Sequence, residues 1–228
     1  SKSFNEKVDL LSLAPKVNCN CLAEWIVQPI MTSLLMIGFP ISDTNDVNSK
    51  TSFAAGPFML FKRESYEKIG GHEGTHSEIV EDLALAKKIK DNNLKLNFLI
   101  AIEDISLNMY KDFESLIEGW SKNWYLGLEK NIIKSFFASI FVFSIYTAPW
   151  LLFISAFYKC LFNTYITIDI YSLILSLSGI IIYGCKRYWL KYKFDIPYKF
   201  WFLNGIGGLV VIYISILSFY KTYTGISW

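Results

Sequence analysis

The pattern of hydrophobic positions divides the chain into a mixed first part and a strongly apolar final part. In the final part, the apolar residues form three runs separated by more polar connections. A helix needs about 20 apolar residues to cross the hydrocarbon core of a bilayer, and each run reaches that length. We therefore predict three membrane-spanning helices, at residues 135–157, 166–185 and 201–220.

Two apolar stretches before these runs predict helices of another kind. Residues 113–132 place apolar side chains, Trp120 and Trp124 among them, at three- and four-residue steps. An interfacial amphipathic helix is predicted here, because the indole ring is apolar with one polar tip. Residues 22–41 are interrupted by Glu24 and by prolines. They predict a helix at the membrane surface or beneath the preceding domain, and a true crossing is the alternative.

The first part of the chain shows the shorter runs of a mixed α/β sheet. Residues 42–52 are polar and predict a loop, and residues 1–20 predict the tail of a helix followed by a connector. Gly70 and Gly71 break the backbone between an aromatic-rich strand and a helix. The predicted strands are residues 53–61, 94–102 and 105–110, and the predicted helix runs over residues 79–91.

Composition agrees with a membrane protein and excludes one class of partner. The chain is 53% hydrophobic and 17% aromatic, and its formal net charge is only +2. A charge this small creates no global field, so no nucleic-acid partner is expected. The four cysteines follow no metal-binding spacing and predict reduced thiols. They are Cys19, Cys21, Cys160 and Cys185.

The placement of charge predicts an orientation in the membrane. Residues 186–200, between the second and third runs, carry five basic residues and a single acid, Asp195, whereas the connection after the first run carries only Lys159. The positive-inside rule places the basic connection in the cytoplasm. Residues 42–132 precede that connection by two predicted crossings, so they are predicted to lie on the cytoplasmic side as well. The basic connection is also suited to anionic lipid head groups, although orientation alone explains it.

The candidate chemistry lies at the start of the predicted helix. Glu81 and Asp82 stand in its first turn, below the Gly70-Gly71 loop and next to a predicted strand. Acidic residues are common at helix starts because they complement the helix dipole, so capping alone accounts for the pair. A carboxylate in this setting is also a reasonable general base.

A longer set of motifs surrounds this acidic pair. They are Gly56-Pro57-Phe58-Met59-Leu60-Phe61-Lys62-Arg63, Ile69-Gly70-Gly71-His72, Val80-Glu81-Asp82-Leu83 and residues 95–100, followed by Met109-Tyr110 and Gly119-Trp120-Ser121-Lys122-Asn123-Trp124. The first four resemble the second half of a family 2 glycosyltransferase. The last two resemble the members of that family that glycosylate membrane lipids, carotenoids or hopanoids.

The resemblance implies a partial GT-A-like mixed sheet domain at residues 1–112, the interfacial helix at 113–132 and three membrane-spanning helices at 133–228. It implies an inverting transfer from a nucleotide sugar to a lipid acceptor hydroxyl, in a multi-pass protein of the cell membrane with its catalytic region in the cytosol. Asp82 is the implied base. The implied acceptor-side residues are Gly56, Phe58, His72, Glu81 and Trp124.

Two family features are missing from these residues. The family holds Mg²⁺ or Mn²⁺ on an Asp-x-Asp motif, and Asp43 and Asp46 do not have that spacing. The family's order places the motif before residue 1, so we expect this chain to be the carboxyl-terminal portion, lacking the donor-binding half and inactive alone. Many relatives also carry Gln/Arg-x-x-Arg-Trp, of which only Trp124 matches; Trp120 and Asn123 occupy the other positions.

Two other functions remain open on the sequence. His72, Glu73 and His76 match the His-Glu-x-x-His pattern of zinc hydrolases. That chemistry needs a helix presenting both imidazoles to one metal, and the glycines here oppose a helix. The second alternative is a non-catalytic membrane module.

Overall fold

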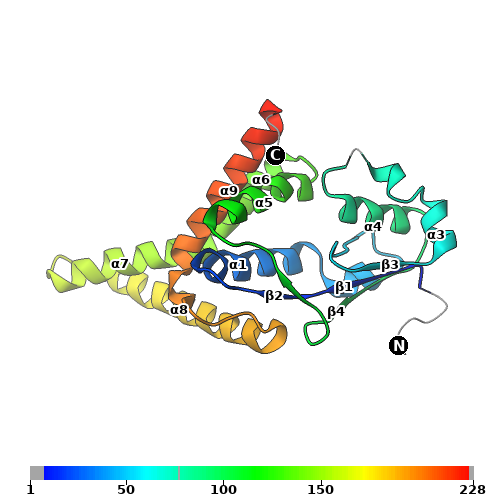
Figure 1. The fold of residues 1–228 in the computed structure, drawn as a ribbon. Coiled ribbons are helices and arrows are strands. Elements are labelled where there is room, and N and C mark those ends of the chain that lie inside the picture. Colours follow the sequence, from blue (N-terminus) through cyan, green and yellow to red (C-terminus); the bar gives the residue numbers. More distant parts are fainter. Residues whose placement is uncertain (1–7, 77, 226–228) are drawn as a thin grey trace. The chain divides into compact units, whose positions relative to one another are not determined.

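The computed structural model describes residues 8–76 and 78–225, which fall into two compact units (Figure 1). The first, here called the sheet unit, comprises Ser1–Asn18 and Thr32–Met109. The second, the helical unit, comprises Cys19–Met31 and Tyr110–Trp228. A small mixed sheet with helices, and three long apolar helices in the carboxyl-terminal part, confirm the predicted fold class.

The sheet unit is built on a central strand, β1. This strand pairs in antiparallel fashion with β3 and in parallel with β4, so that Leu10 lies opposite both Phe61 and Leu96. A second sheet pairs β2 with β5 in parallel. The strands are β1 (Leu10–Ala14), β2 (Lys16–Asn18), β3 (Met59–Phe61), β4 (Leu96–Ile100) and β5 (Ser106–Asn108).

The expectation of a helix tail and connector in residues 1–20 is wrong for the described residues. They contain β1 and β2. The physical reason is that β1 is central and covered on both faces: Leu10, Leu11 and Ser12 are all buried. A strand buried on both faces has no alternation of apolar and polar residues, so its pattern resembles that of a short helical segment.

The core of the sheet unit forms where α4 packs on the sheet. Leu85, Ala86 and Ile89 recur at helical spacing on one face of α4, and all three are buried. They join Leu10 and Leu96 in one apolar cluster. The helix predicted at 79–91 is confirmed with a later start. The helices carried wholly by this unit are α2 (Ile41–Asn45), α3 (Arg63–Lys68) and α4 (Glu81–Asp91), with a 3₁₀ turn at Glu73–Thr75.

The strand predicted at 53–61 is correct only for its last three residues. Residues 53–58 are irregular, and the N–H of Phe58 donates to the carbonyl of Ala55 at 3.2 Å in a tight turn. Pro57 explains the interruption, since it has no N–H to donate to a strand ladder. The loop predicted at 42–52 is also partly helical, because α2 occupies its start.

Among its described residues, the helical unit contains three helices long and apolar enough to cross a membrane. They are Ile132–Leu161, Thr167–Phe194 and Trp201–Thr224, and each contains one of the three apolar runs of the sequence. α1 is apolar but shorter; its first part lies in this unit. The elements are α1 (Leu22–Gly38), α5 (Phe113–Gly127), α6 (Ile132–Val142), a π-helical turn (Phe143–Thr147), α7 (Ala148–Leu161), α8 (Thr167–Phe194), a 3₁₀ turn (Trp201–Leu203) and α9 (Asn204–Thr224).

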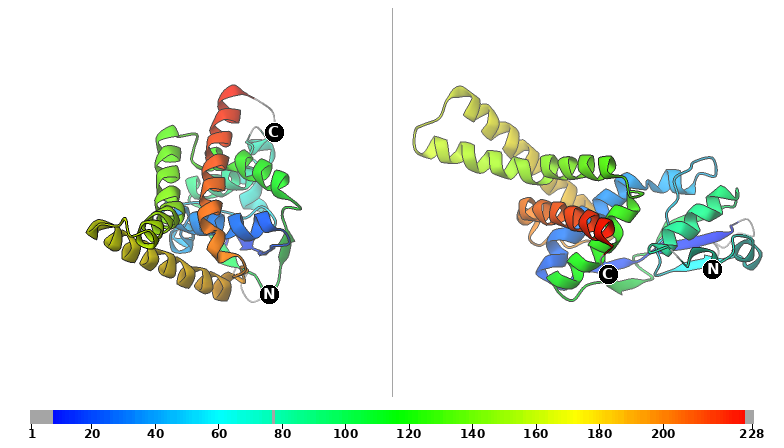
Figure 2. Two further views of the ribbon diagram at one scale, coloured as in Figure 1. Left: turned by 90° about the vertical axis from the view of Figure 1, so that its left-hand side faces the viewer. Right: turned by 90° about the horizontal axis from the view of Figure 1, so that it is seen from above.

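Small polar side chains join α9 to its neighbours. The hydroxyl of Ser215 bonds those of Ser135 and Ser139 on α6, each at 3.0 Å. Ser218 accepts a hydrogen bond from the N–H of Tyr125 on α5. Such hydroxyl contacts are typical of helices packed in lipid. α7 and α8 lie side by side as a hairpin (Figure 2), in which Lys159 and Asp169 form an ion pair at 2.7 Å.

The basic residues near the end of the second crossing lie on a helix rather than in a connection. α8 continues to Phe194, so Lys186, Arg187, Lys191 and Lys193 all belong to it. Arg187, which was counted among the cations of a connection, is fully buried. Burial is tolerated because its guanidinium donates hydrogen bonds to backbone carbonyls, which partly replace its hydration.

Gly207 on α9 marks a close approach to α1. A Cβ atom at this position would lie 2.9 Å from the carbonyl oxygen of Ile26 and 2.8 Å from the side chains of Ile26 and Ile30. We expect Gly207→Ala to lower the unfolding free energy of the helical unit by about 1–3 kcal/mol through overpacking. Thermal unfolding in detergent measures it. Gly127→Ala is the control, since its Cβ meets nothing within 4 Å; equal melting temperatures for both variants would contradict the prediction.

Candidate active site

Asp82 lies at the start of α4 and joins two segments of the sheet unit. Its Oδ1 accepts a hydrogen bond from the N–H of Leu83 at 2.8 Å, and its Oδ2 accepts one from the N–H of Gly56 at 3.0 Å. One oxygen therefore satisfies a free N–H of the helix start, as capping requires. The other reaches the irregular 53–58 segment. A carboxylate has about four lone-pair sites, so acceptor sites remain for a substrate proton.

Burial raises the pKa of the Asp82 carboxyl group. Asp82 is half-buried, and the loss of hydration raises its pKa above the usual 3.8; the hydrogen bonds from Leu83 and Gly56 oppose the rise, and the neighbouring charge of Glu81 adds to it. A general base works best when its pKa approaches the working pH. The direction of the shift is thus the one that a base requires.

The 53–58 segment is fixed from its other side by β1. The buried hydroxyl of Ser12 accepts a hydrogen bond from the N–H of Ala55 at 2.8 Å and donates to the Ala55 carbonyl at 3.3 Å. The next N–H along the chain, that of Gly56, is the one that Asp82 binds. A Cβ at Gly56 would lie 3.1 Å from Oδ2 of Asp82. Glycine therefore lets the backbone approach the carboxylate closely.

The other predicted site residues of the sheet unit are placed around this contact in different ways. Phe58 follows the turn after Gly56 and is half-buried, and its carbonyl accepts a hydrogen bond from the N–H of Leu13. Glu81 precedes Asp82 and is exposed. The structure thus brings Asp82 and Gly56 into direct contact.

His72 is bound to a tyrosine rather than to the carboxylate. Its ring Nδ1 lies 2.6 Å from the hydroxyl oxygen of Tyr66, and its backbone N–H donates to the same oxygen at 3.0 Å. The ring of Tyr66 in turn lies where a side chain on Gly71 would stand, 2.6 Å from its Cβ position. The ammonium group of Lys88 binds the same loop by donating a hydrogen bond to the carbonyl of Gly74 at 2.8 Å. His72 and Tyr66 form a separate exposed pair.

Trp124 belongs to the helical unit, on α5. It is half-buried, and its indole N–H has no hydrogen-bond partner within residues 8–76 and 78–225. Trp120, one turn earlier, donates its indole N–H to the side-chain oxygen of Gln28 at 3.0 Å. The two tryptophans of the predicted interfacial helix therefore differ: Trp120 anchors α5 to α1, and Trp124 keeps an unused donor.

The residues that the structure describes do not fit a bound metal ion. They contain no group of three His, Cys, Asp or Glu side chains arranged to hold one. His72 and His76 flank the 3₁₀ turn Glu73–Thr75, and Nδ1 of His76 lies 2.8 Å from the carbonyl of Glu73. The helix that zinc chemistry needs is not formed by this motif.

Sequence reasoning missed the residues that fix the polar segment 42–52. The side chain of Asn45 pairs with the backbone of Phe98 on β4, accepting from its N–H at 2.6 Å and donating to its carbonyl at 3.0 Å. Lys90 donates to the carbonyls of Asp46 and Ser49. Partial burial lowers the pKa of Lys90, and nearby Asp46 opposes that shift. Isolated polar residues of this kind leave no pattern in a sequence.

Comparison with known proteins finds named relatives of part of this chain. The chain is 28% identical over 99 residues to proteins named 4,4'-diaponeurosporenoate glycosyltransferase from Staphylococcus aureus strains USA300, NCTC 8325 and Newman. The match covers 43% of this chain and 26% of each relative, so the chain spans about a quarter of their length. No family model and no solved structure matches the chain.

Proposed function

We propose that this chain forms the acceptor side of a membrane-bound inverting glycosyltransferase of the family 2 type. The observation that carries the proposal is the half-buried Asp82 carboxylate, with its raised pKa and its hydrogen bond to Gly56. The similarity to named glycosyltransferases supports the reaction class, and the three apolar helices support a membrane location. The proposed donor is a nucleotide sugar and the proposed acceptor is lipid-like, as a carotenoid is.

The proposed step is a single displacement at the anomeric carbon of the donor sugar. The acceptor hydroxyl oxygen forms the new bond to that carbon while the bond to the nucleoside diphosphate breaks. Asp82 takes the hydroxyl proton, and the leaving diphosphate keeps the electron pair of the broken bond. Attack from the side opposite the leaving group inverts the configuration. Asp82 touches a reacting atom in this scheme, and Gly56 positions it.

A base is needed only where the attacking oxygen carries a proton. A hydroxyl is protonated at neutral pH, whereas a carboxylic acid is already ionised, with a pKa near 4. The role given to Asp82 therefore commits the proposal to a hydroxyl acceptor. Divalent metal stays a prediction for residues outside this chain, and no step here uses it.

The proposed membrane arrangement follows the charges near the ends of the helices. Lys186, Lys191 and Lys193 on α8, with Lys199 beyond it, form a basic end opposite the α7–α8 turn. By the positive-inside rule this end faces the cytosol. A cytosolic site suits an activated sugar made in the cytosol and an acceptor held in the adjacent leaflet.

Membranes containing the complete enzyme test the proposal. A panel of labelled nucleotide sugars is supplied with lipid acceptors that end in a hydroxyl or in a carboxylate, and labelled lipid product is measured by extraction. We expect transfer to the hydroxyl acceptors with inverted anomeric configuration. Retained configuration would contradict the proposed displacement, and absence of any glycolipid product would favour a non-catalytic membrane module.

The pKa direction of Asp82 gives a pH prediction. The base acts in its ionised form, so transfer to a hydroxyl acceptor rises as pH increases through the pKa of Asp82. Because burial places that pKa above 3.8, we expect the acid limb of kcat/KM to lie at higher pH than for an ordinary aspartate. The protonated form is favoured by folding, so the associated stability is lost as pH rises through the same pKa. An acid limb at or below the ordinary value would contradict the assignment.

A further inference from the structure

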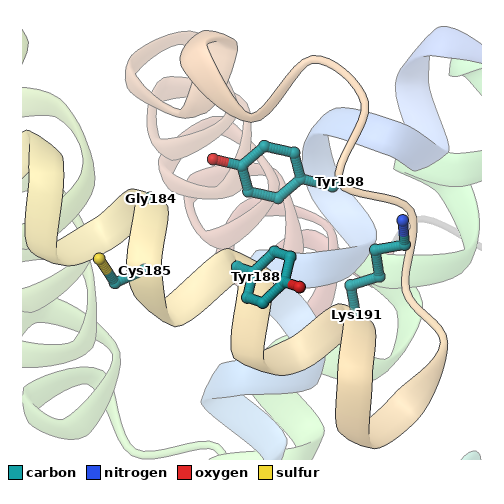
Figure 3. Close-up of a pocket in the computed structure, with 5 residues that line it drawn as sticks. All are labelled: Gly184, Cys185, Tyr188, Lys191 and Tyr198. Atoms are coloured by element: carbon teal, nitrogen blue, oxygen red, sulfur yellow. The ribbon is translucent and has the colours of Figure 1, made fainter.

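A pocket of about 410 Å³ opens beside the last turns of α8, within the helical unit (Figure 3). Its size falls in the range of small-molecule sites, roughly 300–1,000 Å³. Gly184, Tyr188 and Lys191 recur at four- and three-residue steps and share one face of the helix. The opposite wall is Tyr198, in the connection to α9. The lining residues are Gly184, Cys185, Tyr188, Lys191 and Tyr198.

The walls of this pocket are fixed by ring contacts among its lining residues and with Trp201 behind them. The ring of Tyr198 stacks on that of Trp201 at 5.8 Å and meets that of Tyr188 edge to face at 6.1 Å. Trp201 packs against Gly184, where a Cβ would lie 3.2 Å from its ring. Figure 3 shows Tyr198 on the side of α8 from which Tyr188 and Lys191 project. The pocket is therefore formed before any ligand enters.

Arg187 holds the connection against the helix. Its Nη2 donates to the carbonyls of Pro197 at 2.9 Å and Trp25 at 2.6 Å, and its Nε also donates to Pro197. Nη1 has no hydrogen-bond partner among the described residues. The guanidinium is fully buried and makes no ion pair in that part of the chain, so its positive charge adds to the potential at the pocket wall.

The charge around the pocket favours an anion. Within the described ranges, none of Lys186, Lys191, Lys193 and Lys199 belongs to an ion pair. Lys191 is exposed and lines the pocket itself. The phenol hydroxyl of Tyr188 points toward the Lys191 side chain (Figure 3) and can donate a hydrogen bond to a phosphate oxygen. The hydroxyl of Tyr198 points the other way, so Tyr198 contributes its ring to the pocket wall.

The position of the pocket identifies the source of the anion. It lies near the end of a 28-residue apolar helix, among side chains that suit the membrane interface. Trp189 and Tyr192 on the same turns are exposed, as in an aromatic belt. We propose that this pocket binds the phosphate of an anionic membrane lipid, with Lys191 and the Tyr188 hydroxyl as its direct contacts, the Tyr198 ring as its wall and Arg187 as a positioning residue. The site is independent of the proposed transferase activity.

Native mass spectrometry of the full chain in detergent tests the site, with phosphatidylglycerol and phosphatidylcholine as probes. We expect preferential binding of phosphatidylglycerol, and about a fivefold loss of its affinity in Lys191→Gln, the effect of one basic residue near an anionic lipid surface. Lys193→Gln is the matched control: it removes the same charge from the same exposed helix end, outside the pocket. Lys191→Arg is expected to retain binding.

Three outcomes would overturn the proposal. Equal losses in Lys191→Gln and Lys193→Gln would show a diffuse surface effect. Equal binding of both lipids by the wild-type chain would show that no anionic site exists, since two tyrosine rings alone also suit a choline cation. Displacement of the phosphatidylglycerol by excess inorganic phosphate would make this a site for a free anion. The wild-type comparison stands even where a variant fails to fold.

Discussion

Replacing Asp82 by asparagine in the complete enzyme is expected to lower transfer to a hydroxyl acceptor by roughly 10²–10⁴-fold, the usual contribution of a positioned base. Asparagine keeps the size of the side chain but cannot take a proton. It also offers only one oxygen where two N–H groups, those of Gly56 and Leu83, now donate. One of these N–H groups then faces an amide NH₂, which costs about 1–3 kcal/mol of stability where the site is buried.

Two controls separate the chemical loss from this structural one. Asp91→Asn makes the same substitution at the exposed last residue of the same helix, and is expected to keep most of the activity. A carboxylate acceptor needs no base, so Asp82→Asn should transfer to it far better than to a hydroxyl. Initial rates and folded yield are measured together. Loss of both reactions alike, with the fold intact, would remove Asp82 from the proton transfer.

Truncating Leu10 to alanine is expected to destabilise the sheet unit by about 2–5 kcal/mol, the usual loss for a large-to-small core substitution. Leu10 is fully buried on the central strand, between β3 and β4, and belongs to the cluster that includes Leu85 and Ile89 of α4. The cavity left by alanine lies beneath the helix that carries Asp82. The change is measured by urea unfolding, with limited proteolysis at sites within the sheet unit as the readout.

Leu60→Ala is the matched control for this substitution. Leu60 lies on β3, paired with β1, but its side chain is 44% exposed. Little apolar surface leaves water there on folding, so the expected loss is well under that of Leu10→Ala. Equal sensitivity of the two variants would show that β1 is not the centre of the unit.

The sequence predicted those parts of the fold that leave a repeating pattern. α4 was readable because its apolar positions recur at helical spacing, and the three long apolar helices were readable because each is an apolar run of about 20 residues. β1 was not, because Leu10 and Leu11 are buried on opposite faces and no alternation remains. The strand predicted at residues 53–61 was too long. The prediction followed the apolar composition of these residues and gave too little weight to Pro57, which has no N–H to donate to a strand ladder. Arg187 shows a further limit: a count of charges does not reveal that one of them is buried.

The candidate site was predictable only in part for a related reason. Asp82 stands in a recognisable motif, and its neighbourhood in sequence points to a helix start. Its partner Gly56 comes from the same family resemblance, but the contact between them depends on Ser12 fixing Ala55. Ser12 lies 43 residues away on the strand that the pattern did not reveal. Long-range polar contacts of this kind depend on the fold and are invisible to local periodicity.

The helical unit also has a consequence for how the chain can be dissected. Its described residues come from two stretches, Cys19–Met31 and residues 110–225, and the larger part of the sheet unit, Thr32–Met109, lies between them in the sequence. Arg187 donates to Trp25 across 162 residues, and Gly207 packs on Ile26. A fragment that begins at Tyr110 would contain all three long apolar helices of the described residues. In that fragment Arg187 would lose the carbonyl acceptor of Trp25, and Gly207 would lose its packing against Ile26. During synthesis, Cys19–Met31 is translated early but cannot make these contacts until α8 and α9 have been translated. Its packing in the helical unit is therefore completed late.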